Sequence, residues 1–202
     1  MANVVGTWVM ESACMQAQLW RAQGNPLRIG VNISPSQFRS DLPQLVQQVL
    51  AQTKLPAFLL ELEVTEKIFL DSDSAAEQLL RQIRGMGVSL AFDDFGTGYA
   101  SLTHLKRSPL SRLKIDRSFV RDLATDHDSA AIVSAIARLG KRLGLSITAE
   151  GVEDSSLLEP LGEMGCDEAQ GYLFGKPMPA AEFSRLLAAD AGTGMRLRAS
   201  AA

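Results

Sequence analysis

The chain has 202 residues, of which 46% are apolar and 21% charged, and its formal net charge is −3. This length fits a single domain with a core that needs no crosslinks, and the composition excludes disordered, collagen-like and disulfide-rich classes. The acidic balance argues against DNA as a partner. Cys14 and Cys166 fit two buried thiols better than a disulfide. Without a signal peptide or a membrane-length apolar run, the sequence predicts a cytoplasmic protein whose chain makes no membrane contact.

Short apolar runs alternate with helical patterns after an amphipathic N-terminal segment. The runs expected to form strands are residues 27–33, 58–64, 88–92, 113–115, 145–149 and 166–172, and a last helix is expected near residues 181–187. Six strand–helix units in series predict a parallel α/β sheet, because parallel neighbours need crossover helices. Both an open doubly wound sheet and a (β/α) barrel fit this pattern. Residues 189–202 are expected to be a flexible tail.

Polar residues gather where the predicted strands end, which is the edge that carries the chemistry in both kinds of α/β fold. A single carboxylate at such a place is better explained as a helix cap or a solvated loop residue. Five successive strand ends favour a site instead. Crowded carboxylates need a positive partner, and oxygen ligands suit Mg²⁺ or Mn²⁺. The residues concerned are Asn32, Glu63, Glu66, Asp93, Asp94, Lys114, Asp116, Glu150, Glu153 and Gln170.

Two adjacent aspartates, Asp93 and Asp94, can offer oxygens to two ions at once. A pair of hard cations a few ångströms apart is the usual arrangement for in-line attack on a phosphodiester. Lys114 would add a positive group beside the developing charge or the attacking water. The residues alone therefore favour metal-assisted phosphodiester hydrolysis.

Six segments, in this order and spacing, make the chain resemble the EAL domain family of cyclic di-GMP phosphodiesterases from about Trp8 to Leu187. The resemblance implies a TIM-like (β/α) barrel of which about six of eight strand–helix units are present, with residues 1–188 forming the domain. The segments are Val31-Asn32-Ile33-Ser34, Glu63-Val64-Thr65-Glu66, Asp93-Asp94-Phe95-Gly96-Thr97-Gly98-Tyr99, Leu113-Lys114-Ile115-Asp116, Ala149-Glu150-Gly151-Val152-Glu153 and Gln170-Gly171-Tyr172.

The resemblance also implies roles for individual residues. Asn32, Glu63, Asp93, Asp94 and Glu150 match metal ligands of the family, with Asp93 at the position that bridges two Mg²⁺ or Mn²⁺ ions. Lys114, Glu150 and Gln170 match the catalytic set, in which Lys114 assists the nucleophilic water and Gln170 contacts it. Glu66 matches the glutamate that anchors the loop 94–101, and Asp116 and Glu153 match supporting acids.

One departure from the family pattern leaves three functional hypotheses open. The sequence contains no Glu-Ala-Leu segment, whose glutamate is a metal ligand in the family, and two strands of the barrel are expected to be missing. The first hypothesis is hydrolysis of cyclic di-GMP to the linear dinucleotide. The second is a catalytically impaired module that binds cyclic di-GMP or a protein, and the third is a fragment without independent function. Open barrel edges favour a homodimer or a partner chain that covers them.

Overall fold

The computed structural model describes residues 2–38, 41–69, 73–96, 102–190 and 199–201. They form an α/β fold in which strands and helices alternate, as the sequence predicts. The chain divides into two compact units, each assembled from separate segments of the sequence. The first comprises residues 1–63, 74–89 and 177–202, and the second comprises residues 64–73 and 90–176.

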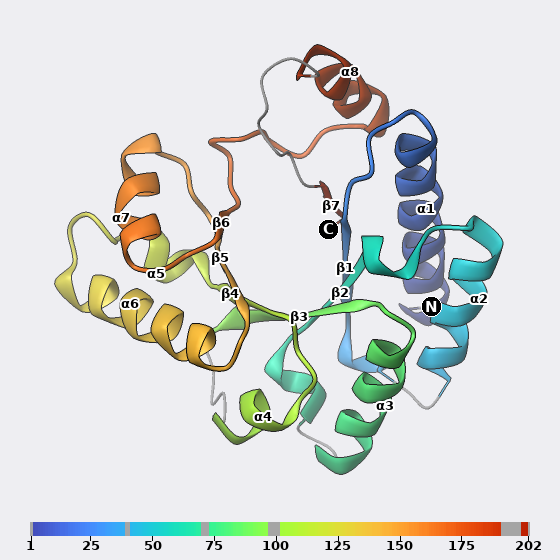
Figure 1. Cartoon of the computed structure of the whole chain (residues 1–202), viewed down its shortest axis with the longest axis horizontal. Helices are drawn as coiled ribbons and strands as arrows, with labels where there is room; N and C mark the ends of the chain where they lie inside the picture. The colour runs from blue at the N-terminus through green and yellow to red at the C-terminus, as the bar shows by residue number, and fades with distance from the viewer. Residues whose placement is uncertain (1, 39–40, 70–72, 97–101, 191–198, 202) are drawn as a thin grey trace. The chain divides into compact units, whose positions relative to one another are not determined.

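The first unit is built on strands β2, β1 and β7, which lie side by side in that order. The long helix α1 packs against both α2 and β1 (Figure 1). At its C-terminal end, Trp20 packs edge-on against Phe183, with ring centroids 5.1 Å apart, and donates a 2.8 Å hydrogen bond to Ser184 Oγ. The elements are α1 (Ala2–Ala22), β1 (Ile29–Ile33), η1 (Pro35–Gln37), α2 (Leu42–Thr53), η2 (Ala57–Leu59), β2 (Leu60–Val64), α3 (Asp73–Gly85), α8 (Ala180–Asp190) and β7 (Ala199–Ala201).

Strand β1 has a neighbour on the edge that the sequence analysis expects to be open. The C-terminal strand β7 pairs with it in parallel, with Ile29 opposite Ala199 and Val31 opposite Ala201. These three residues of β7 belong to the segment 189–202, for which a flexible tail is expected. Residues 191–198 and 202 of that segment lie outside the described residues.

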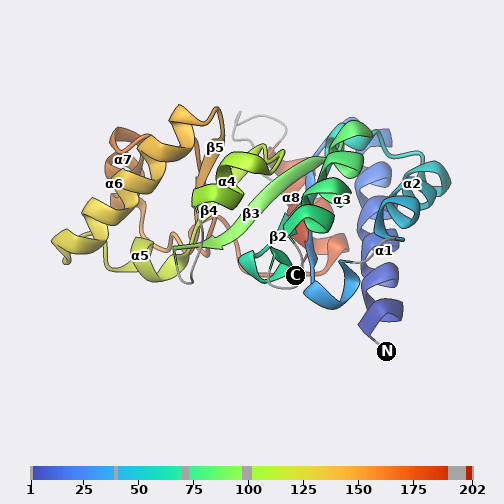
Figure 2. The same ribbon diagram turned by 90° about the horizontal axis from the view of Figure 1, so that it is seen from below.

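The second unit holds β3, β4, β5 and β6, which are neighbours in this order. Helices α5 and α6 pack on each other, and α6 also packs on β4 and β5 (Figure 2). Strand β3 is longer than the predicted run 88–92, and β6 keeps only two residues of the predicted run 166–172. The elements are η3 (Glu66–Phe69), β3 (Ser89–Phe95), α4 (Leu102–Arg107), β4 (Arg112–Ile115), α5 (Arg117–Arg121), α6 (His127–Arg142), β5 (Ser146–Ala149), η4 (Ser155–Leu157), α7 (Leu158–Glu163) and β6 (Glu168–Ala169).

The crossover from β4 to β5 is built from residues with clear local preferences. Asp126 begins α6 by accepting hydrogen bonds from the backbone amides of Asp128 and Ser129, at 3.1 and 3.2 Å. These bonds satisfy amides that the first helical turn leaves without partners. The segment beyond the helix turns at Gly144, whose φ of 76° is a left-handed conformation that glycine adopts at little cost. The crossover thus returns the chain to the sheet as a parallel strand.

Strands β3, β4 and β5 are mostly buried on both faces, as expected for a parallel sheet covered by helices, whereas the two residues of β6 are half-buried. All four residues of β4 are buried, and Leu113 and Ile115 are fully enclosed. Alternating with these apolar residues, β4 also buries Arg112 and Lys114. Buried cations are costly unless they are paired, so their surroundings define the chemistry of this unit.

Both cysteines are free thiols, as the sequence predicts, but only Cys14 is buried and Cys166 is half-buried. Burial raises the pKa of Cys14 to about 12 and that of Cys166 to about 11, which keeps both thiols protonated at neutral pH. Among the described residues, no helix has both the length and the apolar character that a membrane span requires.

Gly171 and Gly162 give a matched test of packing in the second unit. A Cβ on Gly171 would lie 2.1 Å from the carbonyl oxygen of Val152 and 2.4 Å from its nitrogen, whereas a Cβ on Gly162 would meet nothing within 4 Å. Because backbone atoms cannot rotate away, we expect Gly171→Ala to lower the free energy of unfolding by about 1–3 kcal/mol. Gly162→Ala, in a helix, should raise it by about 0.5–1 kcal/mol. Urea denaturation measures both, and equal effects would contradict the packing at Gly171.

Candidate active site

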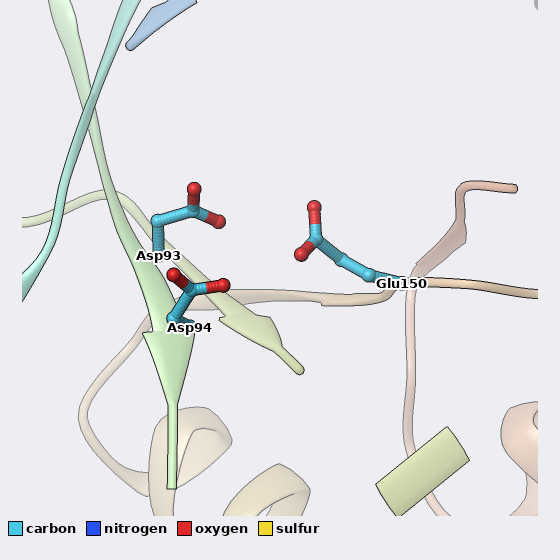
Figure 3. A group of neighbouring side chains, drawn as sticks. All are labelled: Asp93, Asp94 and Glu150. Carbon is cyan, nitrogen blue, oxygen red and sulfur yellow. The ribbon is translucent and has the colours of Figure 1, made fainter. Parts of the chain in front are cut away.

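Four ionisable side chains converge at the C-terminal ends of three neighbouring strands of the second unit. Asp93 and Asp94 lie on β3, Lys114 lies on β4, and Glu150 directly follows β5. Parallel neighbouring strands end at the same edge of a sheet, which brings these residues together although they are far apart in sequence. Figure 3 shows the carboxylates of Asp93 and Glu150 directed toward one another, with that of Asp94 beside them.

A bulge in β3 explains how two consecutive aspartates reach one site. Successive side chains of a regular strand point to opposite faces. Here β3 advances three residues, from Phe92 to Phe95, while its partner β4 advances two, from Leu113 to Ile115. The extra residue lies beside Asp94, whose φ of 53° is left-handed, a conformation that aspartate tolerates better than most residues. The bulge redirects the Asp94 side chain toward the Asp93 carboxylate.

Lys114 is the cation of this group. Its ammonium nitrogen lies 2.6 Å from Glu150 Oε1 and 3.0 Å from Asp93 Oδ1, and its side chain is only 4% exposed. The two carboxylates replace the water that burial removes from this ammonium. The ammonium in turn reduces the repulsion between the carboxylates on β3 and at the end of β5.

Negative charge nevertheless exceeds positive charge within the group, because one ammonium offsets one of three carboxylates. The pKa of Asp94 records this excess. Partial burial raises its pKa from the ordinary value of 3.8, the nearby charges of Asp93 and Asp116 raise it further, and Lys114 opposes the shift. A shared hydrogen bond with Asp116 also favours the protonated form. Additional positive charge in this group is therefore electrostatically favourable.

The geometry and chemistry of the carboxylates fit a hard divalent cation. Asp93, Asp94 and Glu150 each offer an oxygen, and these oxygens all lie within 4.8 Å of one another. Asp93 Oδ1 is buried and accepts no hydrogen bond among the described residues, since its contact with Lys114 is an ion pair without hydrogen-bond geometry. An all-oxygen donor set of this kind suits Mg²⁺ or Mn²⁺ rather than a softer metal.

Four other residues singled out by the sequence lie in the same unit, and of these Asp116 is hydrogen-bonded to Asp94. Asp116 caps α5 by accepting a 2.9 Å hydrogen bond from the Ser118 amide, while Glu66 begins η3 and Glu153 is exposed. The backbone amide of Gln170 donates a 2.8 Å hydrogen bond to the carbonyl of Ala149, which fixes Gln170 beside the end of β5. Their assigned roles remain predictions.

Two predicted metal ligands belong to the first unit. Asn32 is an exposed residue of β1, whereas Glu63 is a buried residue of β2 and only 4% exposed. Their roles as ligands also remain predictions. Residues 97–101 of the loop that Glu66 is expected to anchor lie outside the described residues.

One buried ionic group is not apparent from the sequence. Arg112, Thr148 and Glu168 interact on β4, β5 and β6, each two residues before Lys114, Glu150 and Gln170, respectively. The sequence feature that could have indicated this group is the period of two along each strand, which places residues i and i+2 on the same face. A lone arginine at the start of a short run does not reveal partners 36 and 56 residues away.

Comparison with known families and proteins identifies relatives of the whole region. A family model described as the EAL domain matches residues 1–177. A bifunctional diguanylate cyclase/cyclic di-GMP phosphodiesterase, MucR of Pseudomonas aeruginosa, is 47% identical over 178 residues, which cover 87% of this chain and 26% of MucR. The cyclic di-GMP phosphodiesterase NbdA of the same organism is 40% identical over 201 residues, covering 97% of this chain and 26% of NbdA. The chain thus spans about a quarter of the length of the curated relatives that it matches.

Solved structures show the same fold. The phosphodiesterase PaMucR in complex with c-di-GMP superposes with a TM-score of 0.84 and 46% identity, covering 89% of this chain and 73% of that chain. The EAL domain of Mycobacterium smegmatis DcpA superposes with a TM-score of 0.86 and 36% identity, covering 91% of this chain and 84% of that chain. These relationships confirm the predicted TIM-like α/β fold of the EAL type.

The raised pKa of Asp94 predicts how the metal-free chain responds to pH. Because its folded pKa exceeds the unfolded value of 3.8, the ionised carboxylate reduces stability at neutral pH, and this cost disappears as the pH falls through the folded pKa. We expect Asp94→Asn to raise the thermal midpoint at pH 7 in EDTA, with a gain that declines as the pH falls toward 3.8 and is lost below it. Differential scanning calorimetry across this range measures the effect.

Asp126 supplies the control of opposite sign. The Ser129 hydroxyl and the backbone amide of Asp128 lower the pKa of Asp126, so its ionised form contributes stability at neutral pH that is lost in acid. Asp126→Asn should therefore lower the midpoint at pH 7. A lower midpoint for Asp94→Asn under the same conditions would contradict the charge balance described for the site.

Proposed function

Because the chain belongs to the EAL domain family, we propose that it hydrolyses cyclic di-GMP to the linear dinucleotide with divalent metal ions. The observation that carries this proposal is the convergence of Asp93, Asp94 and Glu150 around Lys114. The names of relatives add support, since two are cyclic di-GMP phosphodiesterases and one solved neighbour is a c-di-GMP complex. The unpaired thiols agree with a reducing compartment, and we place the activity in the cytoplasm.

The charge of the substrate supports metal dependence. A cyclic dinucleotide carries two anionic phosphodiesters, which an acidic site repels unless cations stand between them. We assign Mg²⁺ or Mn²⁺ to this role. Asp93, Asp94 and Glu150 would hold it, and the family resemblance assigns Asn32 and Glu63 as further ligands. When bound, the ions would polarise a phosphoryl oxygen and increase the acidity of the attacking water.

The remaining chemistry falls to side chains of the protein. Water adds its oxygen to one phosphorus, the bond from that phosphorus to a ribose oxygen breaks, and the leaving oxygen takes up a proton. Lys114, held between Asp93 and Glu150, orients the attacking water through its ammonium hydrogens and stabilises negative charge that develops on the phosphoryl group. Gln170, beside the end of β5, contributes a polar contact to the same water.

Supporting roles go to three acids. Asp116 holds the start of α5 beside Lys114 and favours a proton on Asp94 when cations are absent. Glu66 anchors the loop 94–101, and Glu153 completes the polar segment that follows β5. These assignments rest on the family resemblance and on the positions of the three residues along the chain.

One observation favours a second candidate function. The sequence contains no Glu-Ala-Leu segment. The glutamate of that segment is a metal ligand in the family, so a site without the segment has one ligand oxygen fewer. Losses of this kind commonly weaken metal affinity or activity by about 10–100-fold. The alternative is therefore a module that binds cyclic di-GMP, or a protein partner, without turnover.

The two functions differ in their products. We expect the purified chain with Mn²⁺ to convert cyclic di-GMP to the linear dinucleotide, as measured by chromatography. Asp93→Asn should reduce turnover by at least about 100-fold, because the carboxylate charge that would hold the metal disappears while the shape of the side chain remains. Asp128→Asn, an exposed aspartate in the first turn of α6, is the matched control and should leave turnover unchanged.

Each outcome of this assay has a clear consequence. Intact substrate together with measurable binding would support the non-catalytic module, and neither cleavage nor binding would support a fragment without function. Cleavage that survives Asp93→Asn would contradict the metal assignment, even if hydrolysis itself is established.

We further propose that a second copy of the chain covers the outer face of α1. Four large apolar residues lie on that face, and each is more than half exposed: Val4, Trp8, Met15 and Leu19. Viewed along the helix axis, the four positions fall within about one sixth of the circumference. An antiparallel copy would place Val4 opposite Leu19 and Trp8 opposite Met15, so the face is complementary to itself, as a two-fold dimer requires.

A charge in the centre of this face tests the dimer. We expect the chain to have the mass of a dimer by light scattering, and Trp8→Glu to give a monomer, because two buried carboxylates would face an apolar surface. Gln52→Glu introduces the same charge at an exposed position of α2 and should leave the dimer intact. A monomeric parent chain, or a dimer that survives Trp8→Glu, would contradict this interface.

A further inference from the structure

A buried arginine lies one layer below the candidate active site. Arg112 begins β4, two residues before Lys114, and its side chain is only 4% exposed. Arginine is rarely buried, because a guanidinium without partners in an apolar interior is strongly unfavourable. Arg112 takes no part in the proposed hydrolysis, so its burial needs another explanation.

The Arg112 guanidinium joins three strands. One of its terminal nitrogens donates a 2.6 Å hydrogen bond to Thr148 Oγ1 on β5 and also binds a carboxylate oxygen of Glu168 on β6. Thr148 is itself buried, at 4% exposure. Guanidinium has a planar fork of donors on a long stem, which suits it to hold two partners on neighbouring strands at once.

The register of the sheet aligns this group with the site above it. Lys114 pairs with Thr148 across β4 and β5, and Thr148 pairs with Glu168 across β5 and β6. Residues two apart on a strand share a face. Each of Arg112, Thr148 and Glu168 therefore shares a face with the residue two positions later on its own strand, namely Lys114, Glu150 and Gln170, and Thr148 and Glu168 are level with Lys114 across the sheet.

Strand β6 has little backbone pairing of its own. It contains two residues. The Asp167 amide donates to Ile147 at 2.9 Å just before it, and after it the Gln170 amide donates to Ala149 at 2.8 Å, the Val152 amide to Gln170 at 3.0 Å and the Leu173 amide to Val152 at 3.1 Å. So short a strand is weakly fixed by its ladder alone. The ion pair between Arg112 and Glu168 supplies a side-chain link across the same gap.

We propose that Arg112 is a positioning residue: through Thr148 and Glu168 it holds the ends of β5 and β6, and so sets Glu150 and Gln170 relative to Lys114. Its importance for catalysis rests on the proposed function, whereas its control of the strand ends does not. A purely stabilising ion pair is the competing explanation, and the two can be separated. Replacing a buried ion pair by apolar residues commonly restores stability, but it cannot restore the directed contacts.

The experiment compares Arg112→Met with the double variant Arg112→Met/Glu168→Leu in the full chain. We expect the single variant to melt at a lower temperature and the double variant to regain the parent's thermal midpoint. In the double variant, hydrogen exchange of the Gln170 and Val152 amides, followed by NMR without metal or substrate, should remain at least about tenfold faster than in the parent. The Mn²⁺ dissociation constant should rise by about tenfold, because Glu150 is no longer held in place.

Arg81→Met provides the matched control. Arg81 pairs with Glu77 at 3.1 Å on α3 of the first unit, so its loss breaks an arginine–glutamate pair elsewhere. Exchange of the Gln170 and Val152 amides and the Mn²⁺ affinity should be unchanged in this variant. If they change as much as in the Arg112 variants, the effect is general and the proposal fails.

A purely stabilising role predicts that, in the double variant, amide exchange and Mn²⁺ affinity return to the parent values along with the thermal midpoint. That result would overturn the proposal. If the double variant does not fold, Glu168→Gln decides, since it keeps the size of the side chain and removes its charge. Faster exchange at Gln170 in that variant supports the proposal, and unchanged exchange overturns it.

The catalytic consequence has its own measurement. In a hydrolytically active parent, the double variant should lower kcat by about tenfold while KM stays within about threefold. A parent chain that hydrolyses nothing would contradict the proposed function alone, because the exchange measurement still decides whether Arg112 positions the strand ends.

Discussion

The ion pairs of Lys114 with Asp93 and Glu150 are the interaction on which the site depends. A lysine that is 4% exposed needs carboxylates in place of water, and carboxylates this close together need a cation. Neither side is stable at this strand edge without the other. The three strand ends are therefore held together by charge as well as by the backbone ladder. The excess of acid over base that remains after this pairing is what makes divalent cations favourable here.

Backbone geometry decides which oxygens take part. In a regular strand Asp93 and Asp94 would point to opposite faces, and one of them would be lost to the site. The bulge in β3 and the left-handed conformation of Asp94 place both carboxylates near Glu150. The conformation is tolerable because aspartate is among the few residues other than glycine that adopt it readily. The left-handed backbone and the high density of negative charge thus occur at the same residue, because the first brings the Asp94 carboxylate to the other two.

Patterns in the sequence predict the alternation of strands and helices, and the placement of Lys114 and Glu150 at one edge follows from it. Such patterns are local: apolar runs, caps and glycines report what each segment prefers. The pattern places Asp93 and Asp94 at the end of their strand, where both lie in β3, but the bulge between them depends on register with β4 and is not visible in the sequence. Arg112 was missed for a similar reason. Its partners come from β5 and β6, and only the assembled sheet brings a guanidinium and Glu168 together.

The two cationic layers of β4 differ in a way that follows from the chemistry of their side chains. Arg112 presents a rigid fork whose donors are directed at fixed partners, so it suits a contact that persists. Lys114 presents a compact charge with rotatable donors on a flexible stem. Its ammonium can move away from a carboxylate oxygen when a cation binds there, because the cation then compensates the negative charge. If the lower layer moved as readily, Glu150 would have no fixed position from which to bind. An arginine below and a lysine above therefore give the strand ends rigidity where the sheet must be held and freedom where charge must be exchanged.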